Sequence, residues 1–181
     1  MLFNLLKKTE PRSFFTDKTY ASLEAKKRAC VALAQKDANL LFIAWFADTA
    51  GEFVQLFEAN ELPRERIIEA RSLHSAKLAG HRPVFLEHYP LRAKEKALVE
   101  HWPPQQIEVY NSLEDGLLKH FGSDRIATLM KQMGMQPEEV IEHPLISKSI
   151  ASAQEKIAGR VVLEQTATSQ KDWMEKNLKE F

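Results

Sequence analysis

A continuous run of seven apolar residues at positions 40–46 is the feature that most limits how this chain can fold. Such a run is typical of a strand that is buried on both faces, as strands are in a parallel sheet. Three further strands are expected at residues 66–70, 83–87 and 106–110, and helical patterns separate them. Because strands that alternate with helices form βαβ units, this part of the sequence predicts an α/β fold, with a small, mostly parallel sheet and flanking helices.

The last third of the sequence predicts helices only. Proline is favoured in the first turn of a helix, so Pro144 is expected to start a long one. Its apolar side chains would form one stripe, at Ile146, Ile150, Ala153 and Ile157. The stripe resumes near Trp173, which extends the expected helix towards the end of the sequence. We therefore expect an α/β domain at residues 1–111 and a helical extension at residues 112–181 that packs on it and ends in this helix.

The charge balance argues against a nucleic-acid partner. Lys plus Arg and Asp plus Glu each number 25, so the formal net charge of the 181 residues is zero, whereas nucleic-acid-binding proteins usually carry a basic excess or stripe. No apolar run reaches the ~18 residues of a membrane span, and the start of the sequence has too short an apolar stretch for a signal peptide. The single cysteine, Cys30, is expected to be a buried helix residue. The sequence thus predicts a cytoplasmic protein without stable membrane insertion.

Residues 111–160 carry a series of short motifs in a fixed order. They read S-x-E-D, F-x-x-D-R-I, a Gly-Met turn, I-E-H-P and S-K-x-I-x-x-A-Q-x-K-I. This order resembles the end of the second motor domain of SecA, the preprotein translocase ATPase, and the start of the SecA scaffold helix. The matching positions are Ser112, Glu114, Asp115, Phe121, Asp124, Arg125, Ile126, Gly134, Met135, Ile141, Glu142, His143, Pro144, Lys148, Ile150, Ala153, Gln154 and Lys156.

Earlier segments resemble the same SecA domain more faintly. Residues 68–76 are similar to the strand that ends in N-A-K-x-H-A in that family, with Ala70, His74 and Ala76 at matching positions. Residues 84–88 are similar to the strand that leads to its E-R-H-E turn. The resemblance implies a degenerate RecA-like, helicase-like fold with three layers.

The parts that make SecA a motor are missing from this sequence. It contains no G-x-x-x-x-G-K-[ST] loop to wrap nucleotide phosphates. Residues 100–104 replace the G-R-x-G-R arginine-finger loop of the family. An arginine finger is worth about 10³–10⁵ in rate in phosphoryl-transfer enzymes. The resemblance therefore implies a non-catalytic relative, with no ATPase activity, no catalytic residues and no cofactor.

Polar side chains follow the predicted strands, at the edge of a parallel sheet where ligands usually bind. The candidate cleft residues are Asp48, Thr49, Arg71, His74, Glu87, His88 and Arg92. One interpretation is a retained site for a nucleotide or another small molecule, which would make the chain a regulator. The other is that these residues are helix caps and surface ion pairs, with Thr49 and Glu52 as a capping box. The histidines lack the spacing of zinc ligands, so no metal site is expected.

Three large apolar side chains are expected to contact a partner. Trp102 precedes two prolines and is expected to be partly exposed, and Trp173 and Leu178 lie on the terminal helix. A tryptophan on a helix without a complete core is a typical interface anchor, although packing of Trp173 on its own domain is equally compatible with the pattern. We expect a protein-interaction module or accessory factor that docks to a translocase component, to another protein or to a second copy of itself.

Overall fold

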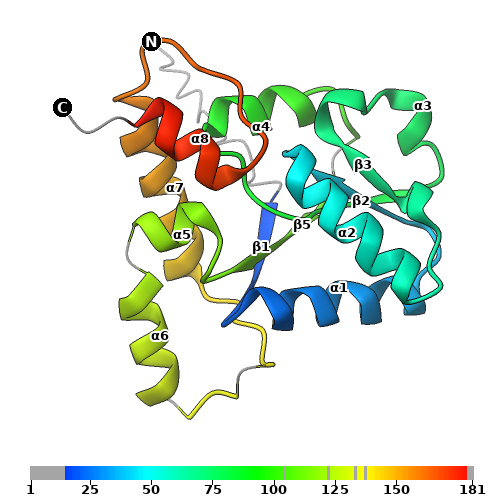
Figure 1. The fold of residues 1–181 in the computed structure, drawn as a ribbon, viewed down its shortest axis with the longest axis horizontal. Helices are drawn as coiled ribbons and strands as arrows, with labels where there is room; N and C mark the ends of the chain where they lie inside the picture. Colours follow the sequence, from blue (N-terminus) through cyan, green and yellow to red (C-terminus); the bar gives the residue numbers. More distant parts are fainter. Residues whose placement is uncertain (1–14, 104, 122, 133, 137, 179–181) are drawn as a thin grey trace, which may run out of the picture.

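The computed structural model describes residues 15–178 apart from positions 104, 122, 133 and 137. Its centre is a five-stranded sheet with parallel pairings in the order β1-β5-β4-β2-β3 (Figure 1). The strands are β1 (Phe15–Tyr20), β2 (Leu40–Ala44), β3 (Ile67–Glu69), β4 (Arg82–Phe85) and β5 (Ile107–Ser112). The predicted α/β fold with a parallel sheet is confirmed, and the four predicted strands form close to their expected positions.

Strand β1 was not predicted from the sequence. It pairs with β5 along its whole length, yet it contains the polar residues Asp17 and Thr19, both of which are buried. These polar residues interrupt the apolar run that identifies the other strands. The edge of β1 that faces away from β5 pairs with the chain at one residue. There, Thr19 and Ile141 exchange two backbone hydrogen bonds of 3.2 and 2.7 Å in an antiparallel bridge.

Helices α1 (Leu23–Lys36) and α2 (Ala47–Ala59) cover one face of the sheet (Figure 1). Alternate residues of a strand point to opposite faces, and Leu40 and Phe42 of β2 point into this apolar core. Cys30 of α1 is fully buried there, as predicted, and burial raises the pKa of its thiol to about 12.

The opposite face of the sheet is covered mainly by α4 (Arg92–Val99) and the residues that follow it. Its core includes Phe85 and Val109, and Trp102 stacks on Phe85 with ring centroids 6.1 Å apart. Short elements complete the β3 side of the sheet: two 3₁₀ turns (Arg64–Arg66 and Ala70–Ser72) and α3 (Ser75–Leu78).

The helices that follow β5 are α5 (Gly116–His120), α6 (Ser123–Gln132), α7 (Pro144–Ala158) and α8 (Gln170–Asn177). A separate apolar cluster joins them to the segments just after β2 and β5, through Phe46 and Leu113. The helices therefore pack beyond the carboxyl ends of the strands (Figure 1). His143 caps α7 by accepting a hydrogen bond from the Leu145 N–H, and Pro144 occupies its first turn as predicted.

The prediction of one long terminal helix is wrong, because two separate helices form. Helix α7 ends at Ala158, and its C-cap is Gly159, a residue type that costs about 1 kcal/mol in a helix interior relative to alanine. The chain then lacks regular structure until Ser169, whose hydroxyl caps α8 by accepting from the Asp172 N–H. The apolar stripe that resumes at Trp173 thus belongs to a second helix that folds back on the domain.

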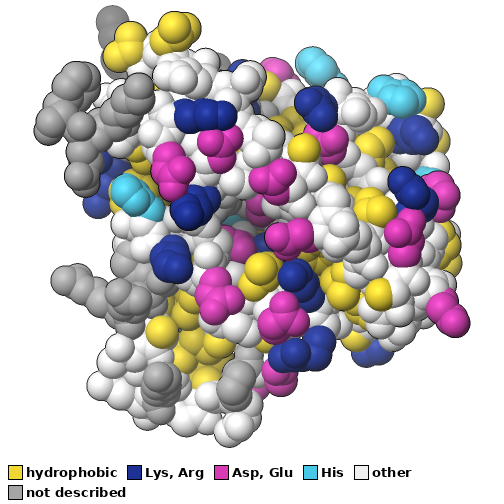
Figure 2. Space-filling view, in the orientation of Figure 1, with side chains coloured by type: hydrophobic (Ala, Val, Ile, Leu, Met, Phe, Trp, Pro, Cys, Tyr) yellow, Lys and Arg dark blue, Asp and Glu magenta, His cyan; other side chains and the backbone are white. Residues whose placement is uncertain are grey.

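Acidic and basic side chains are interspersed on the face shown in Figure 2. Many are paired across elements, for example Lys18 with Glu142 at 2.7 Å and Arg28 with Glu138. Exposed pairs of this kind contribute little to stability.

Candidate functional site

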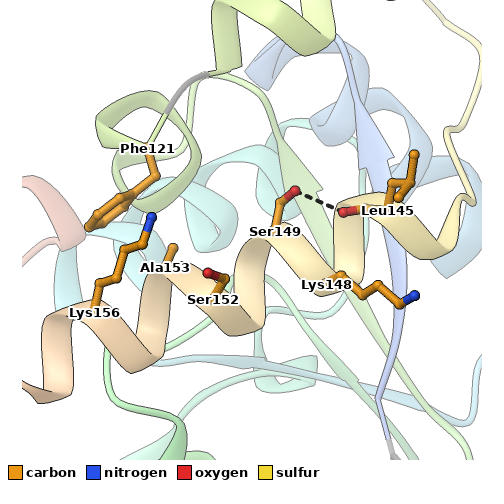
Figure 3. Close-up of a pocket in the computed structure, with 7 residues that line it drawn as sticks. All are labelled: Phe121, Leu145, Lys148, Ser149, Ser152, Ala153 and Lys156. Atoms are coloured by element: carbon orange, nitrogen blue, oxygen red, sulfur yellow. Dashed lines mark hydrogen bonds between the residues drawn. The ribbon is translucent and has the colours of Figure 1, made fainter.

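A surface groove of about 270 Å³ runs along the outer side of α7 (Figure 3). Its lining residues are Phe121, Leu145, Lys148, Ser149, Ser152, Ala153 and Lys156. None of these residues belongs to the cleft that the sequence predicted. Two of the predicted cleft residues, Glu87 and His88, instead belong to a buried polar cluster at the carboxyl ends of the strands, and Thr49 contacts it.

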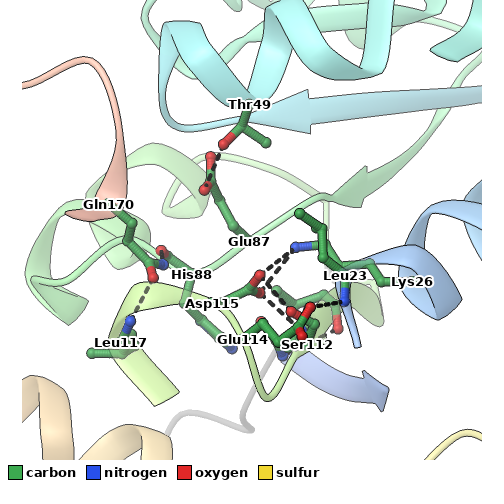
Figure 4. Close-up of polar contacts among 12 residues, drawn as sticks. Leu23, Lys26, Thr49, Glu87, His88, Ser112, Glu114, Asp115, Leu117 and Gln170 are labelled. Carbon is green, nitrogen blue, oxygen red and sulfur yellow. Dashed lines mark hydrogen bonds and ion pairs between the residues drawn. The ribbon is translucent and has the colours of Figure 1, made fainter. Parts of the chain in front are cut away.

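We call this second feature the carboxyl-edge cluster; Figure 4 shows part of it. Its members are buried or nearly so and come from β1, α1, the segment after β4, α4 and the end of β5: Asp17, Lys26, Glu87, His88, Glu95, Asn111, Ser112 and Asp115. Parallel sheets usually bind ligands at this edge. Here the chain's own side chains and the helices after β5 occupy it.

Glu87 ties the end of β4 to the start of α2 (Figure 4). One carboxylate oxygen accepts the Trp45 and Phe46 N–H groups at 3.1 and 3.2 Å, and the other accepts the Thr49 hydroxyl at 2.9 Å. Burial raises the pKa of Glu87 to about 7, so this carboxyl group titrates near neutral pH. Glu87 therefore satisfies donors at the first turn of α2 and holds that helix against the sheet.

The prediction that Thr49 and Glu52 form a capping box at the start of α2 is wrong. The helix begins at Ala47, and its N-cap, Phe46, has no side-chain cap. Thr49 lies inside the first turn and donates its hydroxyl to Glu87. Glu87, in the segment after β4, accepts the N–H of the N-cap residue Phe46. The N–H of Asp48 in the first turn is accepted at 2.9 Å by the Thr168 carbonyl of the loop before α8.

His88 points to a different set of partners from Glu87. Its Nε2 lies 2.6 Å from the Asp17 carboxylate, and its Nδ1 lies 2.7 Å from the Glu95 carboxylate. Although burial opposes the charge, the carboxylates of Glu95 and Asp17 raise the pKa of His88 to about 10. Burial also opposes the charge on Asp17, but His88 lowers the pKa of Asp17 below its usual value. The imidazolium therefore bridges two carboxylates, and Asn111 adds a 2.9 Å hydrogen bond to Asp17.

Two glutamines connect this network to the C-terminal helices. Gln154 of α7 donates to the Glu95 carboxylate at 2.9 Å and to the Tyr89 carbonyl at 2.7 Å. Gln170 of α8 donates to the His88 carbonyl at 2.7 Å, and its side-chain oxygen accepts the Leu117 N–H at 2.6 Å. These contacts join α5, α7 and α8 to the segment that leaves β4.

Gly116 allows α5 to approach α8 this closely. A Cβ atom at position 116 would lie 3.2 Å from the side-chain oxygen of Gln170 and 3.4 Å from its backbone carbonyl carbon. The 3.4 Å contact is ordinary van der Waals contact, whereas the 3.2 Å contact would require the Gln170 side chain to shift by a few tenths of an ångström. A larger residue at position 116 would therefore press on the hydrogen bond between Gln170 and the Leu117 N–H.

Lys26 and Asp115 form the second charged pair of the cluster. Lys26 is 1% exposed, and its ammonium lies 2.9 and 3.1 Å from the two Asp115 carboxylate oxygens. Asp115 also accepts the N–H and the hydroxyl of Ser112, both at 2.9 Å, and it is the N-cap of α5. Neighbouring Glu114 accepts the Leu23 N–H at 2.7 Å. The Glu114–Asp115 motif thus links α1 to the start of α5.

The seven predicted cleft residues have different environments. Thr49 and Glu87 contact each other, and His88 lies in the ion-pair network. Asp48 accepts the Thr168 hydroxyl at 2.9 Å, so it meets the loop before α8. The remaining three lie towards the surface: Arg71 in an ion pair with Glu69, His74 against the Ser72 carbonyl, and Arg92 half-exposed at the start of α4.

Sequence reasoning missed the cluster members Asp17, Lys26, Glu95 and Asn111, and also Gln154, which binds the cluster through Glu95. Lys26 had a detectable signal, because it lies four positions before Cys30 on the buried side of α1. Asp17 and Glu95 had none, since each is paired with His88 from a distant part of the sequence. Gln154 matched a motif of the SecA resemblance, but that match implied no contact.

The three predicted partner residues pack within the described chain. Trp173 is 0% exposed, and its indole N–H donates to Glu164 at 3.0 Å. Leu178 is half-buried in the same apolar cluster, and half-buried Trp102 stacks on Phe85. The structure thus favours the alternative interpretation of Trp173, packing on its own domain. Within residues 15–178, where they are described, the exposed large apolar side chains are Val140, Leu145, Val162 and Leu163.

Among the described residues, no three His, Cys, Asp or Glu side chains are grouped to hold a metal ion. Within the same part of the chain, the helices are too short or too polar to cross a membrane. The carboxyl-edge cluster can hold β1, α1, α4 and the segments after β4 and β5 together by charge and hydrogen bonding. The α7 groove presents a surface to solvent. No model of a known protein family matches the chain.

Proposed function

We propose that the chain is a non-catalytic protein-interaction module related to the second motor domain of SecA. The five-stranded parallel sheet with flanking helices is compatible with a RecA-like, helicase-like domain, and the motifs of residues 111–160 supply the reason to prefer SecA. The proposal includes the division at residue 111, the absence of ATPase activity and the cytoplasmic location expected from the sequence.

One observation carries this proposal: the polar side chains at the carboxyl edge serve the architecture of the chain itself. Glu87 binds the first turn of α2, His88 bridges two carboxylates, and Lys26 is paired with Asp115. A ligand site needs polar groups that converge on a cavity, and these groups converge on each other. Meanwhile α7 and the loop after it carry exposed apolar side chains, Leu145 at 60% and Leu163 at 83% exposure.

The alternative is a regulator that binds a nucleotide or another small molecule at the predicted cleft. It has less support, since Glu87 and His88 are buried and would have to break their present contacts to meet a ligand. Titration with adenine nucleotides, followed by intrinsic tryptophan fluorescence, separates the two proposals. Saturable binding below about 1 mM would favour the regulator.

The interaction module is tested by affinity capture with the immobilised full chain from native lysate. The matched comparison is the double variant Leu145→Ser/Leu163→Ser, which changes only exposed side chains. A protein retained by the wild type and lost by the variant supports the proposal. Phosphate release from ATP that is abolished by a Glu87→Gln substitution in the chain would end it.

A further inference from the structure

We infer that the α7 groove is a docking site for an acidic amphipathic helix of another protein. The inference rests on the proposed interaction function and names its surface and the chemistry of the partner. It starts from the outer side of α7, whose inner stripe (Ile146, Ile150, Ala153 and Ile157) is buried.

The middle of the groove is lined by small side chains, and an apolar side chain lies at each end (Figure 3). Ser149 and Ser152 form the floor, and Ala153 of the buried stripe borders it. Phe121 lies beside Lys156 at one end and Leu145 lies at the other. The Ser149 hydroxyl donates to the Leu145 carbonyl at 2.8 Å, so it turns back onto its own helix. Small side chains let two helices approach within the usual 8–10 Å between axes.

The charge of the groove selects an acidic partner. Lys148 and Lys156 are exposed, and none of the described residues that line the groove is acidic. Within the described residues, neither ammonium group takes part in a hydrogen bond or an ion pair. This differs from Lys26, Lys18 and Lys176, whose ammonium groups are paired.

The spacing of the two lysines fits a helix better than a single ion. Eight positions on an α-helix correspond to about 12 Å along its axis. The two ammonium groups point towards opposite ends of the groove (Figure 3), so one carboxylate or phosphate does not contact both in this arrangement. A partner helix lying along α7 can present carboxylates two turns apart, with an apolar side chain between them for Phe121 or Leu145. This is the helix-in-groove mode of recognition.

A second copy of the chain fits the groove poorly. In a two-fold symmetric contact the same patch occurs on both sides, so pairing two α7 helices would bring the lysines of one copy towards those of the other. Like charges in such a contact are unfavourable. The partner is therefore a different polypeptide with the opposite charge.

The test measures binding of a fluorescent synthetic helix to the full chain by anisotropy. The probe carries a leucine stripe flanked by glutamates two turns apart. Wild-type chain should bind it saturably, and Lys148→Glu/Lys156→Glu should weaken binding roughly tenfold, because two exposed ion pairs are lost and replaced by repulsion. Lys36→Glu/Lys77→Glu, an equal charge change on exposed residues of α1 and α3, should bind like the wild type.

Two further arms make the result specific. A probe with lysines in place of glutamates should bind the charge-reversed variant better than the wild type. The substitution Ser152→Trp should block the acidic probe, because it fills the floor of the groove without changing charge.

Equal binding of the acidic probe to the wild type and to Lys148→Glu/Lys156→Glu would overturn the inference. So would a single-stranded oligonucleotide that binds with the same dependence on the two lysines, or a dimer in light scattering that this variant abolishes. A partner captured by the chain but indifferent to Lys148 and Lys156 would refute this surface and leave the proposed interaction function standing.

Discussion

Two regions of this fold are stabilised differently: the core between the sheet and helices α1 and α2, and the carboxyl edge of the sheet. The core between the sheet and helices α1 and α2 is apolar, with Phe42, Phe53 and Phe57 fully buried. At the carboxyl edge, charged and amide side chains are buried beside the apolar cluster that contains Trp173. The first region depends on packing that many apolar residue types could supply. The second depends on particular pairs, such as Lys26 with Asp115.

The difference shows where the chain tolerates change. Volume-conserving apolar substitutions in a core usually cost little, whereas removing one partner of a buried charge pair leaves the other unpaired and costs several kcal/mol. Helix α5 is attached through the Lys26–Asp115 pair, and α7 and α8 are attached through the buried hydrogen bonds of Gln154 and Gln170. We therefore expect the attachment of α5, α7 and α8 to be more sensitive to single substitutions than the attachment of α1 and α2.

The largest expected effect tests whether the carboxyl edge is packed as tightly as the core. Trp173→Ala should lower the free energy of unfolding by about 4 kcal/mol, as should Phe53→Ala, because both side chains are fully buried. Urea denaturation measures both. If Trp173→Ala cost less than about 1 kcal/mol, α8 would not be packed as described.

A smaller loss should follow from breaking one charge pair. Lys26→Met keeps the length of the buried side chain but leaves Asp115 without its ion-pair partner, which should cost about 3 kcal/mol. Lys36→Met, an exposed change on the same helix, is the control and should cost less than about 0.5 kcal/mol. Equal losses for the two variants would contradict the importance of the buried pair.

The pH dependence of the free energy of unfolding tests whether the pKa of Glu87 is raised in the fold. Burial raises the pKa of this carboxyl group from its usual 4.5 to about 7 in the fold, so its contribution to stability is complete below pH 4.5 and is lost as pH rises through 7. Between pH 5 and pH 7 the wild type should lose about 2 kcal/mol relative to Glu87→Gln. Taking the difference between the two proteins removes the contribution of His88. A difference that does not change with pH would show that Glu87 titrates normally.

The smallest effect is expected where apolar side chains touch solvent. Val162→Ser/Leu163→Ser should change the free energy of unfolding by less than about 0.5 kcal/mol, because both residues are exposed. Thermal melting of the two proteins side by side is sufficient. A loss above about 1 kcal/mol would mean that these residues pack against part of the chain.

The sequence predicted the apolar region far better than the polar one. Strand β2 and the buried stripe of α7 follow from local periodicity, which neighbouring residues carry. The carboxyl-edge cluster depends on contacts between distant positions: Asp17 and His88 are 71 positions apart, and Lys26 and Asp115 are 89 apart. Local patterns contain no information on such pairs. Strand β1 was missed for the same reason. Its buried polar residue Asp17 is paired with His88 and Asn111, which are distant in the sequence.

The prediction of one long terminal helix failed for a different reason. An apolar stripe that stops after Ile157 and resumes at Trp173 fits one long helix and two short helices equally well. Gly159 and the polar segment before Ser169 favour an interruption, and burial of Trp173 against the domain decides between the two.

The bridge between Thr19 and Ile141 bears on the behaviour of the protein in concentrated solution. Strand β1 is an outer strand of the sheet, and outer strands with open backbone groups recruit strands from other molecules and start aggregation. The segment around Ile141 occupies part of that border with two backbone hydrogen bonds. At the opposite border, β3 has only three residues, too short to template much pairing. The bridge at Thr19 and the short length of β3 thus reduce the outer backbone on which self-propagating assembly could start.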